Sequence, residues 1–185
     1  MKILLEKVYK KVVSFLNKEN YKYLIIGGIA AGTLGEPRVT GDVDVDIILD
    51  RQDIPDFLDK AKKARFEVSK EKCLRAAKQT GTLQINYGDF HIDFIIASTD
   101  LEEQAFERRK TIALYGIKAF FPTPEDLILF KIIPGRKQDL LDAESVVLRH
   151  KEKLDIRYLK TWAKKLSDQA EDMRIWNELK RLLKD

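Results

Sequence analysis

Alternating carboxylates are the feature of this sequence that most directly suggests chemistry. Asp42, Asp44 and Asp46 alternate with Val43 and Val45, so a strand here would project the acids from one face, about 6.5–7 Å apart. Like charges this close destabilise a fold unless something neutralises them, and carboxylate oxygens are the preferred ligands of hard divalent cations. Because strands are depleted in aspartate, the run predicts a metal site rather than an edge strand whose acids merely face solvent.

A Gly-Gly pair precedes the acids. The apolar run of residues 23–26 ends at Gly27 and Gly28, and thirteen residues separate Gly28 from Asp42. Glycine permits close approach of the backbone to a ligand, and the free N–H groups of a helix N-terminus bind phosphate. We therefore expect a phosphate site beside the acidic strand end, although a Gly-Gly pair alone is also typical of a tight turn.

These segments together resemble the signature of the polymerase-β-type nucleotidyltransferase superfamily. That signature is a hydrophobic stretch, Gly-Gly or Gly-Ser, a spacer, and then Asp-hydrophobic-Asp, which LIIGG and DVDV match here. Arg38 and Thr40 fit the Arg-x-Thr-x-Asp-x-Asp pattern of many small members, and Asp93, within FHIDFI, is similar to the family's third carboxylate on a later strand. The resemblance covers about residues 20–150.

A later segment also looks like part of this family. PTPEDLILFKIIPGRKQDLLDAE resembles the helical segment that follows the catalytic domain in small uncharacterised and toxin-like members. A lysine, a second basic residue and an aspartate recur there, and the corresponding residues here are Lys131, Arg136 or Lys137, and Asp139 or Asp142. The alternative is an ordinary amphipathic helix pair with a Pro-Gly break.

The resemblance implies a fold and a division of the chain. We expect the α+β class, with a nucleotidyltransferase-like mixed β-sheet flanked by helices and a C-terminal helical part. The catalytic α/β domain would occupy residues 1–121, and a helical region packed on it would occupy residues 122–185.

The resemblance also implies the site. Asp42, Asp44 and Asp93 would be catalytic and would bind two Mg²⁺ or Mn²⁺ ions, with a nucleoside triphosphate such as ATP as the substrate. The implied nucleotide-binding residues are Gly27, Gly28, Arg38, Thr40 and Lys131. Additional candidates are Asp46, His91, Arg136 and Asp139.

Two of these additional candidates leave alternatives open. If Asp44 and Asp46 formed the family's pair, the spacer would be fifteen residues, longer than usual. We prefer Asp42 and Asp44, with Asp46 near the site or paired with a basic residue. His91 could face the same side as Asp93, although a lone strand histidine is more often structural.

Hydrophobic periodicity and turn residues predict the elements that must position these side chains. Predicted strands cover residues 23–26, 42–49 and 65–69, with hairpins that pair 82–87 with 90–97 and 111–114 with 117–121. Predicted helices cover residues 2–18, 29–34, 53–64, 101–110, 124–133, 138–150, 155–166 and 167–183.

Composition sets the broad class of protein. The chain has 185 residues, is 44% hydrophobic and carries a net charge of +4, which favours an anionic ligand such as a nucleotide or RNA. The sequence has no apolar run long enough to span a membrane, and its N-terminus lacks the apolar core of a signal peptide, so we expect a cytoplasmic protein without a membrane partner.

Its single cysteine, Cys73, excludes an intrachain disulfide. The 35% of charged residues is typical of thermophile proteins.

The leading hypothesis is a metal-dependent nucleotidyltransferase that moves a nucleoside monophosphate from a triphosphate to an acceptor hydroxyl. The acceptor could be an RNA end such as that of tRNA, a protein or a small molecule. A toxin-like role with an antitoxin partner fits the same layout. The alternatives are a catalytically silent module that binds a nucleotide or a partner on the same fold, and a metal-dependent phosphatase or nuclease.

Overall fold

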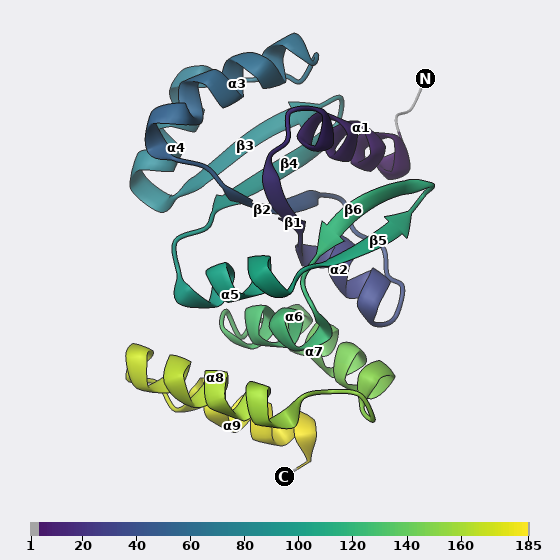
Figure 1. Cartoon of the computed structure of the whole chain (residues 1–185), viewed down its shortest axis with the longest axis vertical. Helices are drawn as coiled ribbons and strands as arrows, with labels where there is room; N and C mark the ends of the chain where they lie inside the picture. Colours follow the sequence, from purple (N-terminus) through teal and green to yellow (C-terminus); the bar gives the residue numbers. More distant parts are fainter. Residues whose placement is uncertain (1–3, 185) are drawn as a thin grey trace. The chain divides into compact units, whose positions relative to one another are not determined.

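A computed structural model describes residues 4–184, and Figure 1 traces the chain. The chain forms two compact units. The first contains the residues up to Ile29 and Val39–Phe121, and the second contains Ala30–Arg38 and the residues from Pro122 onward. No pattern in the sequence indicates that Ala30–Arg38 would group with the later helices. The assignment of catalysis to residues 1–121 stays a prediction.

A mixed sheet organises the first unit, with strands in the order β1-β2-β4-β3. β2 runs parallel to β4, whereas β1 pairs with β2, and β3 with β4, in antiparallel fashion. The β3–β4 pair is the predicted hairpin, which turns at Gly88 with a positive φ of 61°. The strands of this sheet are β1 (Lys22–Ile25), β2 (Val43–Ile48), β3 (Thr82–Tyr87) and β4 (Phe90–Ile96).

One face of this sheet forms the core of the first unit. The side chains that alternate with the acids of β2 are fully buried, as a half-buried strand requires. The ring of Phe57, on α3, lies 5.1 Å from that of Phe94 on β4 and 5.8 Å from that of Phe15 on α1. Helices therefore cover the apolar face and leave the acids on the other face. The helices of this unit are α1 (Leu5–Lys18), the start of α2 (Gly27–Leu34), the short η1 (Arg51–Asp53), α3 (Ile54–Lys63), α4 (Lys70–Thr80) and α5 (Asp100–Arg108).

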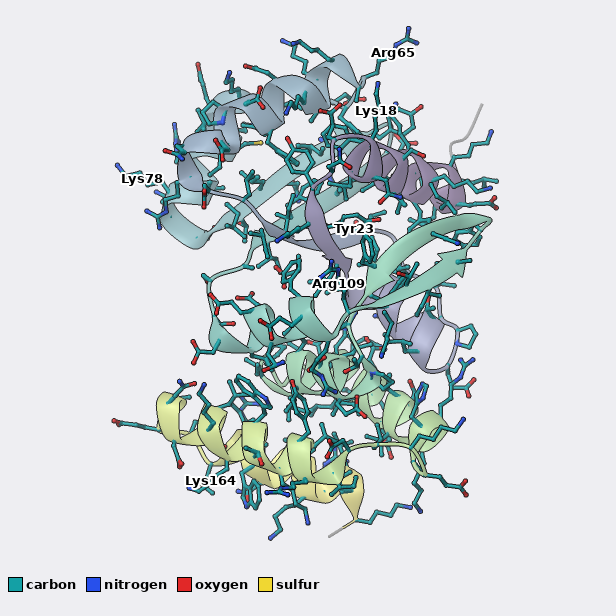
Figure 2. All side chains as sticks on the ribbon, in the orientation of Figure 1. Lys18, Tyr23, Arg65, Lys78, Arg109 and Lys164 are labelled. Atoms are coloured by element: carbon teal, nitrogen blue, oxygen red, sulfur yellow. The ribbon has the colours of Figure 1, made fainter. Side chains whose placement is uncertain are left out.

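A second hairpin, β5 (Lys110–Leu114) and β6 (Ile117–Phe121), lies beside β1. Tyr23 joins the two, because its ring packs 5.5 Å from that of Phe120 on β6. Figure 2 labels Tyr23 at this position, and it also shows Lys78 of α4 extending away from the ribbon. The contact of Tyr23 with Phe120 therefore joins the second hairpin to β1, whereas Lys78 is exposed to solvent.

The predicted strand at residues 65–69 is wrong, and helix α4 follows it unpredicted. Residues 65–69 contribute an isolated bridge between Glu67 and Asn86. Helix α4 escapes prediction because it buries Cys73 and Ala77 and is otherwise mostly charged, which leaves too little apolar periodicity to detect. It ends at Gly81, whose φ of 69° is the left-handed conformation that favours glycine.

The second unit is helical. Helix α6 packs against α7 and α8, and α8 and α9 run side by side (Figure 1). Arg174 completes the C-terminal end of α6, since its guanidinium donates hydrogen bonds to the carbonyls of Ile132 and Ile133 at 2.9 and 2.6 Å. Within residues 4–184, no helix is both long and apolar enough to cross a membrane. The helices are α6 (Pro124–Ile132), α7 (Lys137–His150), α8 (Ile156–Ala170) and α9 (Arg174–Leu183).

The boundary predicted between the last two helices is wrong. The sequence predicts that Ser167 begins the final helix, but α8 continues to Ala170 and α9 begins at Arg174. Ser167 belongs to the buried stripe of α8, and its hydroxyl accepts a hydrogen bond from the backbone N–H of Trp176 at 3.0 Å. Ser167 therefore satisfies a backbone N–H of α9, but it does so from within α8 and not from the start of α9. The sheet, the flanking helices and the helical second unit confirm the predicted α+β class.

Candidate active site

Two of the predicted acids face each other across parallel strands. Asp44 on β2 is the register partner of Asp93 on β4, and adjacent strands lie about 4.8 Å apart. Both residues are half-buried, on the face opposite the apolar core. The sheet therefore brings together two carboxylates that lie 49 positions apart in the sequence.

The carboxylate of Asp44 lies directly against the Gly-Gly turn. The N–H of Ile26 donates to the carbonyl of Asp44 at 3.0 Å, which holds the turn next to β2. Gly27 has a φ of 62°, and a Cβ built on it would lie 1.8 Å from Oδ2 of Asp44. Glycine is required here for both its conformation and its lack of a side chain. Helix α2 begins at this residue, so its first N–H groups lie close to the acid.

Asp93 and His91 have polar partners on the neighbouring strand. The amide of Gln84 donates to Oδ1 of Asp93 at 2.7 Å. His91 is exposed, and its Nδ1 shares a 2.8 Å hydrogen bond with Oδ1 of Asn86. Sequence reasoning misses Gln84, although the β3–β4 register that pairs it with Asp93 follows from the predicted hairpin.

Asp46 is the most deeply buried acid of the sheet. It is 2% exposed, and within residues 4–184 its Oδ1 has no hydrogen-bond partner. Burial, and then the nearby carboxylate of Glu102, raise the pKa of Asp46 to about 8. The lone pairs of an unsatisfied buried carboxyl are costly to the fold, and the basic partner that the sequence suggests for this residue is not observed at this oxygen.

The remaining predicted residues of the first unit border these acids in the chain. Asp42 precedes β2 and is half-buried, as is Thr40, while Gly28 is buried in the first turn of α2. Across residues 4–184, no three His, Cys, Asp or Glu side chains already converge on one point. The available donors, two facing carboxylates and a third just before β2, are the oxygen ligands that hard divalent cations prefer.

Lys131, in the second unit, is held by two acids of α7. Its Nζ lies 3.0 Å from Oδ1 of Asp139 and 2.9 Å from Oδ2 of Asp142. All three side chains are at most 8% exposed. Buried charges of this kind require close, hydrogen-bonded partners. The ion pairs account for the burial of Lys131, and its predicted contact with a triphosphate stays a prediction.

The same acids also bind two arginines. Arg136, whose side chain is 77% exposed, pairs with Asp139, and Arg38 donates from Nε and Nη2 to both oxygens of Asp142 at 2.7 and 2.9 Å. Burial alone would raise the pKa of Asp142, but hydrogen bonds from Arg38, Lys131 and Gln138 outweigh it and hold the pKa below its ordinary value. The carboxylate is therefore charged at neutral pH.

Comparison with known proteins identifies relatives of the chain. The model of a family described as nucleotidyltransferase of unknown function (DUF6036) matches residues 4–184. The solution structure of the antibiotic-resistance factor ANT(2'')-Ia is similar, with a TM-score of 0.61 at 14% identity over 90% of this chain and 94% of that chain. A lincomycin-bound lincosamide antibiotic adenylyltransferase, LnuA, has a TM-score of 0.55 at 12% identity over 79% of this chain and 98% of that chain. The comparison with curated proteins found no match.

Proposed function

Because the chain belongs to the family of nucleotidyltransferases of unknown function (DUF6036) and is an enzyme of that class, we propose that the acidic face of its sheet carries the reaction. The enzyme would move a nucleoside monophosphate from a nucleoside triphosphate to an acceptor hydroxyl. The observation that carries the proposal is the in-register pair of Asp44 and Asp93, with the carboxylate of Asp44 against Gly27 at the start of α2.

The donor set on this face fits a divalent cation. Asp42, Asp44 and Asp93 supply carboxylate oxygens, and the absence of a side chain at Gly27 lets the carboxylate of Asp44 lie directly against the turn. One or two Mg²⁺ or Mn²⁺ ions held by these acids would neutralise the triphosphate and the attacking and leaving oxygens. Without a cation, the two facing carboxylates repel each other.

The chain's own residues would bind the triphosphate and accept the proton of the acceptor. The acceptor oxygen attacks the α-phosphorus, the bond to the β-phosphate oxygen breaks, and pyrophosphate leaves. Asp93 accepts the proton of the acceptor hydroxyl. The N–H groups at the start of α2, from Gly27 and Gly28, bind phosphate oxygens, and Thr40 donates its hydroxyl to the triphosphate. Direct phosphate contacts of Arg38 and Lys131 stay predictions.

The acceptor is a hydroxyl of an RNA end, of a protein or of a small molecule. The two similar structures are those of an antibiotic-resistance factor and an antibiotic adenylyltransferase. At 14% and 12% identity they support the fold, so the acceptor has to be found by screening. An antitoxin partner would appear as a stable complex that blocks transfer.

Thermal unfolding with each nucleoside triphosphate, with and without Mg²⁺ or Mn²⁺, tests the proposal. A ligand at about a hundred times its dissociation constant stabilises the folded state by about 2.7 kcal/mol, which raises the melting temperature measurably. We expect a metal-dependent increase with at least one triphosphate, and its loss in the variant that combines Asp42→Asn and Asp44→Asn.

A matched control removes two acids from elsewhere in the same unit. Asp56→Asn with Asp59→Asn changes two carboxylates on α3, which covers the opposite face of the sheet. This variant should keep the full ligand-induced increase. If no triphosphate stabilises the folded wild-type protein, a catalytically silent module that binds a partner rather than a nucleotide becomes the better account. A positive result would identify the donor and lead to an acceptor screen with labelled nucleotide.

A further inference from the structure

The acidic face of the sheet changes in character from its inner strands to its outer strand. β3 is the outermost strand in the order β1-β2-β4-β3, and an isolated bridge joins Asn86 on its outer side to Glu67. On the acidic face, the strand register places Asp44 beside Asp93 and Asp93 beside Gln84. These last three residues form one row across three strands, in which the two inner side chains are carboxylates and the outermost is an uncharged amide.

The neighbouring rows of the sheet repeat this arrangement. Thr82 lies in the row of the buried Asp46, since both are register partners of Ile95. At the other end of β3, Asn86 is the register partner of His91. Because alternate residues of a strand share one face, β3 presents on the acidic face a set of uncharged side chains that can all form hydrogen bonds: Thr82, Gln84 and Asn86.

The hydrogen bonds already formed determine which groups β3 and β4 offer to a ligand. Gln84 uses one of its two side-chain N–H donors on Oδ1 of Asp93, at 2.7 Å. Nδ1 of His91 shares a 2.8 Å hydrogen bond with Oδ1 of Asn86. Because an amide oxygen only accepts, Nδ1 carries the proton, and Nε2 of the neutral ring is an acceptor. Gln84 and His91 are exposed and Asn86 is half-buried; we refer to these three residues as the edge polar group.

The edge polar group combines hydrogen-bond donors with acceptors, which suits hydroxyl groups. A hydroxyl both donates and accepts, whereas an ammonium group only donates and a phosphate is bound best by cationic donors. Gln84 and Asn86 are two positions apart on one strand, about 6.5–7 Å, and His91 lies about 5 Å across the hairpin from Asn86. These separations allow hydroxyls on one sugar to contact two members of the group.

The two neighbours of Asp93 lie on opposite sides of it. On the β2 side, Asp44 lies against Gly27 at the start of α2, which is where the proposed function places the triphosphate. Gln84 lies on the β3 side. In an in-line displacement the attacking oxygen lies opposite the leaving pyrophosphate, and the base that takes its proton must be within hydrogen-bond reach. The acceptor therefore approaches Asp93 from the side of β3.

We propose that the edge polar group is the acceptor subsite, and that the acceptor is a sugar with adjacent hydroxyls. One hydroxyl attacks: its oxygen bonds to the α-phosphorus, its proton passes to Asp93, and pyrophosphate leaves. The neighbouring hydroxyl bonds to Gln84 or Asn86. This inference rests on the proposed function and narrows its acceptor, because the single hydroxyl of a serine or tyrosine side chain has no neighbour for the group to bind. The terminal ribose of an RNA and a free sugar present the same chemistry, so the test has an arm for each.

Pairs of acceptors that differ in one hydroxyl test the subsite. The first pair is a short RNA that ends in ribose and the same RNA ending in 2′-deoxyribose, which keeps the 3′-hydroxyl. The second pair is methyl ribofuranoside and its 2-deoxy counterpart. Transfer from each labelled triphosphate with Mn²⁺ gives kcat/KM for every acceptor. In the wild type we expect one pair to accept the nucleotide, with kcat/KM about tenfold lower for the deoxy member, the factor that corresponds to one lost hydrogen bond.

Gln84→Leu and Asn86→Leu show whether the edge polar group reads that hydroxyl. In at least one of them the ratio between the paired acceptors should fall to about twofold or less, because the partner of the missing hydroxyl is gone. A general loss of rate, which Gln84→Leu would cause through Asp93, does not change this ratio. Gln79→Leu is the matched control and should keep the full ratio. Gln79 is an exposed amide of α4, two positions after the buried Ala77, so it projects from the opposite side of that helix.

The remaining outcomes separate the subsite from the proposed function. An unchanged ratio in both leucine variants, or preferred labelling of a serine peptide over both sugars, would overturn the subsite; if one variant does not fold, the other decides. If no probe accepts a nucleotide, the side-chain amide NMR signals of Gln84 and Asn86 are followed as methyl ribofuranoside is added, with Gln79 as the reference. Shifts confined to the first two would support the subsite although the proposed function fails, and no shift would refute the subsite.

Discussion

The molecule contains two groups of aspartates that differ in what surrounds them. In the helical unit, Asp139 and Asp142 are buried and share the ammonium of Lys131. In the sheet unit, Asp93 accepts a hydrogen bond from an uncharged amide, and the buried Asp46 keeps an oxygen without a partner among residues 4–184. The number of acids does not distinguish the two groups, but the charge of their partners does.

This difference separates a structural role from a functional one. A buried carboxylate with cationic partners is already neutralised, and its removal leaves an uncompensated charge behind. A carboxylate that faces another carboxylate, as Asp44 faces Asp93, lowers stability until a cation arrives. Mutations in the helical group should therefore mainly reduce stability, and mutations in the sheet group should mainly reduce activity.

The largest effect on stability is expected for Lys131→Met. Removing the ammonium leaves two buried carboxylates without their shared cation, and the loss of one partner of a buried ion pair typically costs about 3–5 kcal/mol. The free energy of unfolding from urea denaturation, followed by circular dichroism at pH 7, measures the effect. Lys164→Met is the control, because Lys164 forms an exposed pair with Asp168 and should change stability by less than about 0.5 kcal/mol. Equal effects of the two substitutions would contradict the assignment.

Gly27→Ala should have the next largest effect. The backbone at Gly27 has a positive φ that strains a residue with a Cβ, and the added Cβ collides with Oδ2 of Asp44. The two costs together amount to about 2–4 kcal/mol. Gly81→Ala separates them, because Gly81 has a φ of 69° and an added Cβ there would meet nothing within 4 Å; it should lose about 1 kcal/mol. The difference between the two free energies of unfolding is the cost of displacing Asp44. Equal losses would mean that the carboxylate moves aside freely.

The sequence predicts much of the sheet group and little of the helical group. The alternation around Val43 and Val45 is enough to assign the buried face of β2 and the acidic face opposite. The partner of Asp44 comes from the family resemblance alone, because a parallel register depends on contacts between distant segments and leaves no local pattern.

Local sequence patterns also fail to predict the distant contacts of the helical group. Asp139 and Asp142 are three residues apart, so the sequence suffices to place them on one face of a helix. Their partner Arg38 lies 104 positions before Asp142, and no periodicity reports a contact at that distance. A lysine in an apolar helix is visible in the sequence, but the reason for its burial is not.

Asp46→Asn should change how stability depends on pH. The folded-state pKa of about 8 lies above the ordinary value, so the contribution of Asp46 to stability is greatest at low pH and is lost as the pH rises from about 4 towards 8. The loss approaches about 1.4 kcal/mol per pH unit. In chelator, the variant should gain about 2 kcal/mol relative to the wild type between pH 5.5 and pH 7. Asp89→Asn removes an exposed acid at the hairpin turn and serves as the control. A gain that is independent of pH would refute the buried carboxyl as its source.

The smallest effect on stability, and the sharpest test of the comparison, is expected for Asp93→Asn. Asp93 is half-buried and its partner is an exposed amide, so the gain from removing its repulsion of Asp44 and the loss of this hydrogen bond are both small. The free energy of unfolding should therefore change by less than about 0.5 kcal/mol. The loss of the carboxylate that takes the acceptor's proton should nevertheless slow nucleotidyl transfer by about 10²–10⁴-fold. Lys131→Met would show the opposite ratio, with the larger loss in stability. If Asp93→Asn instead destabilises the fold as strongly as Lys131→Met does, the sheet acids are structural as well, and the charge of the partners no longer separates the two groups.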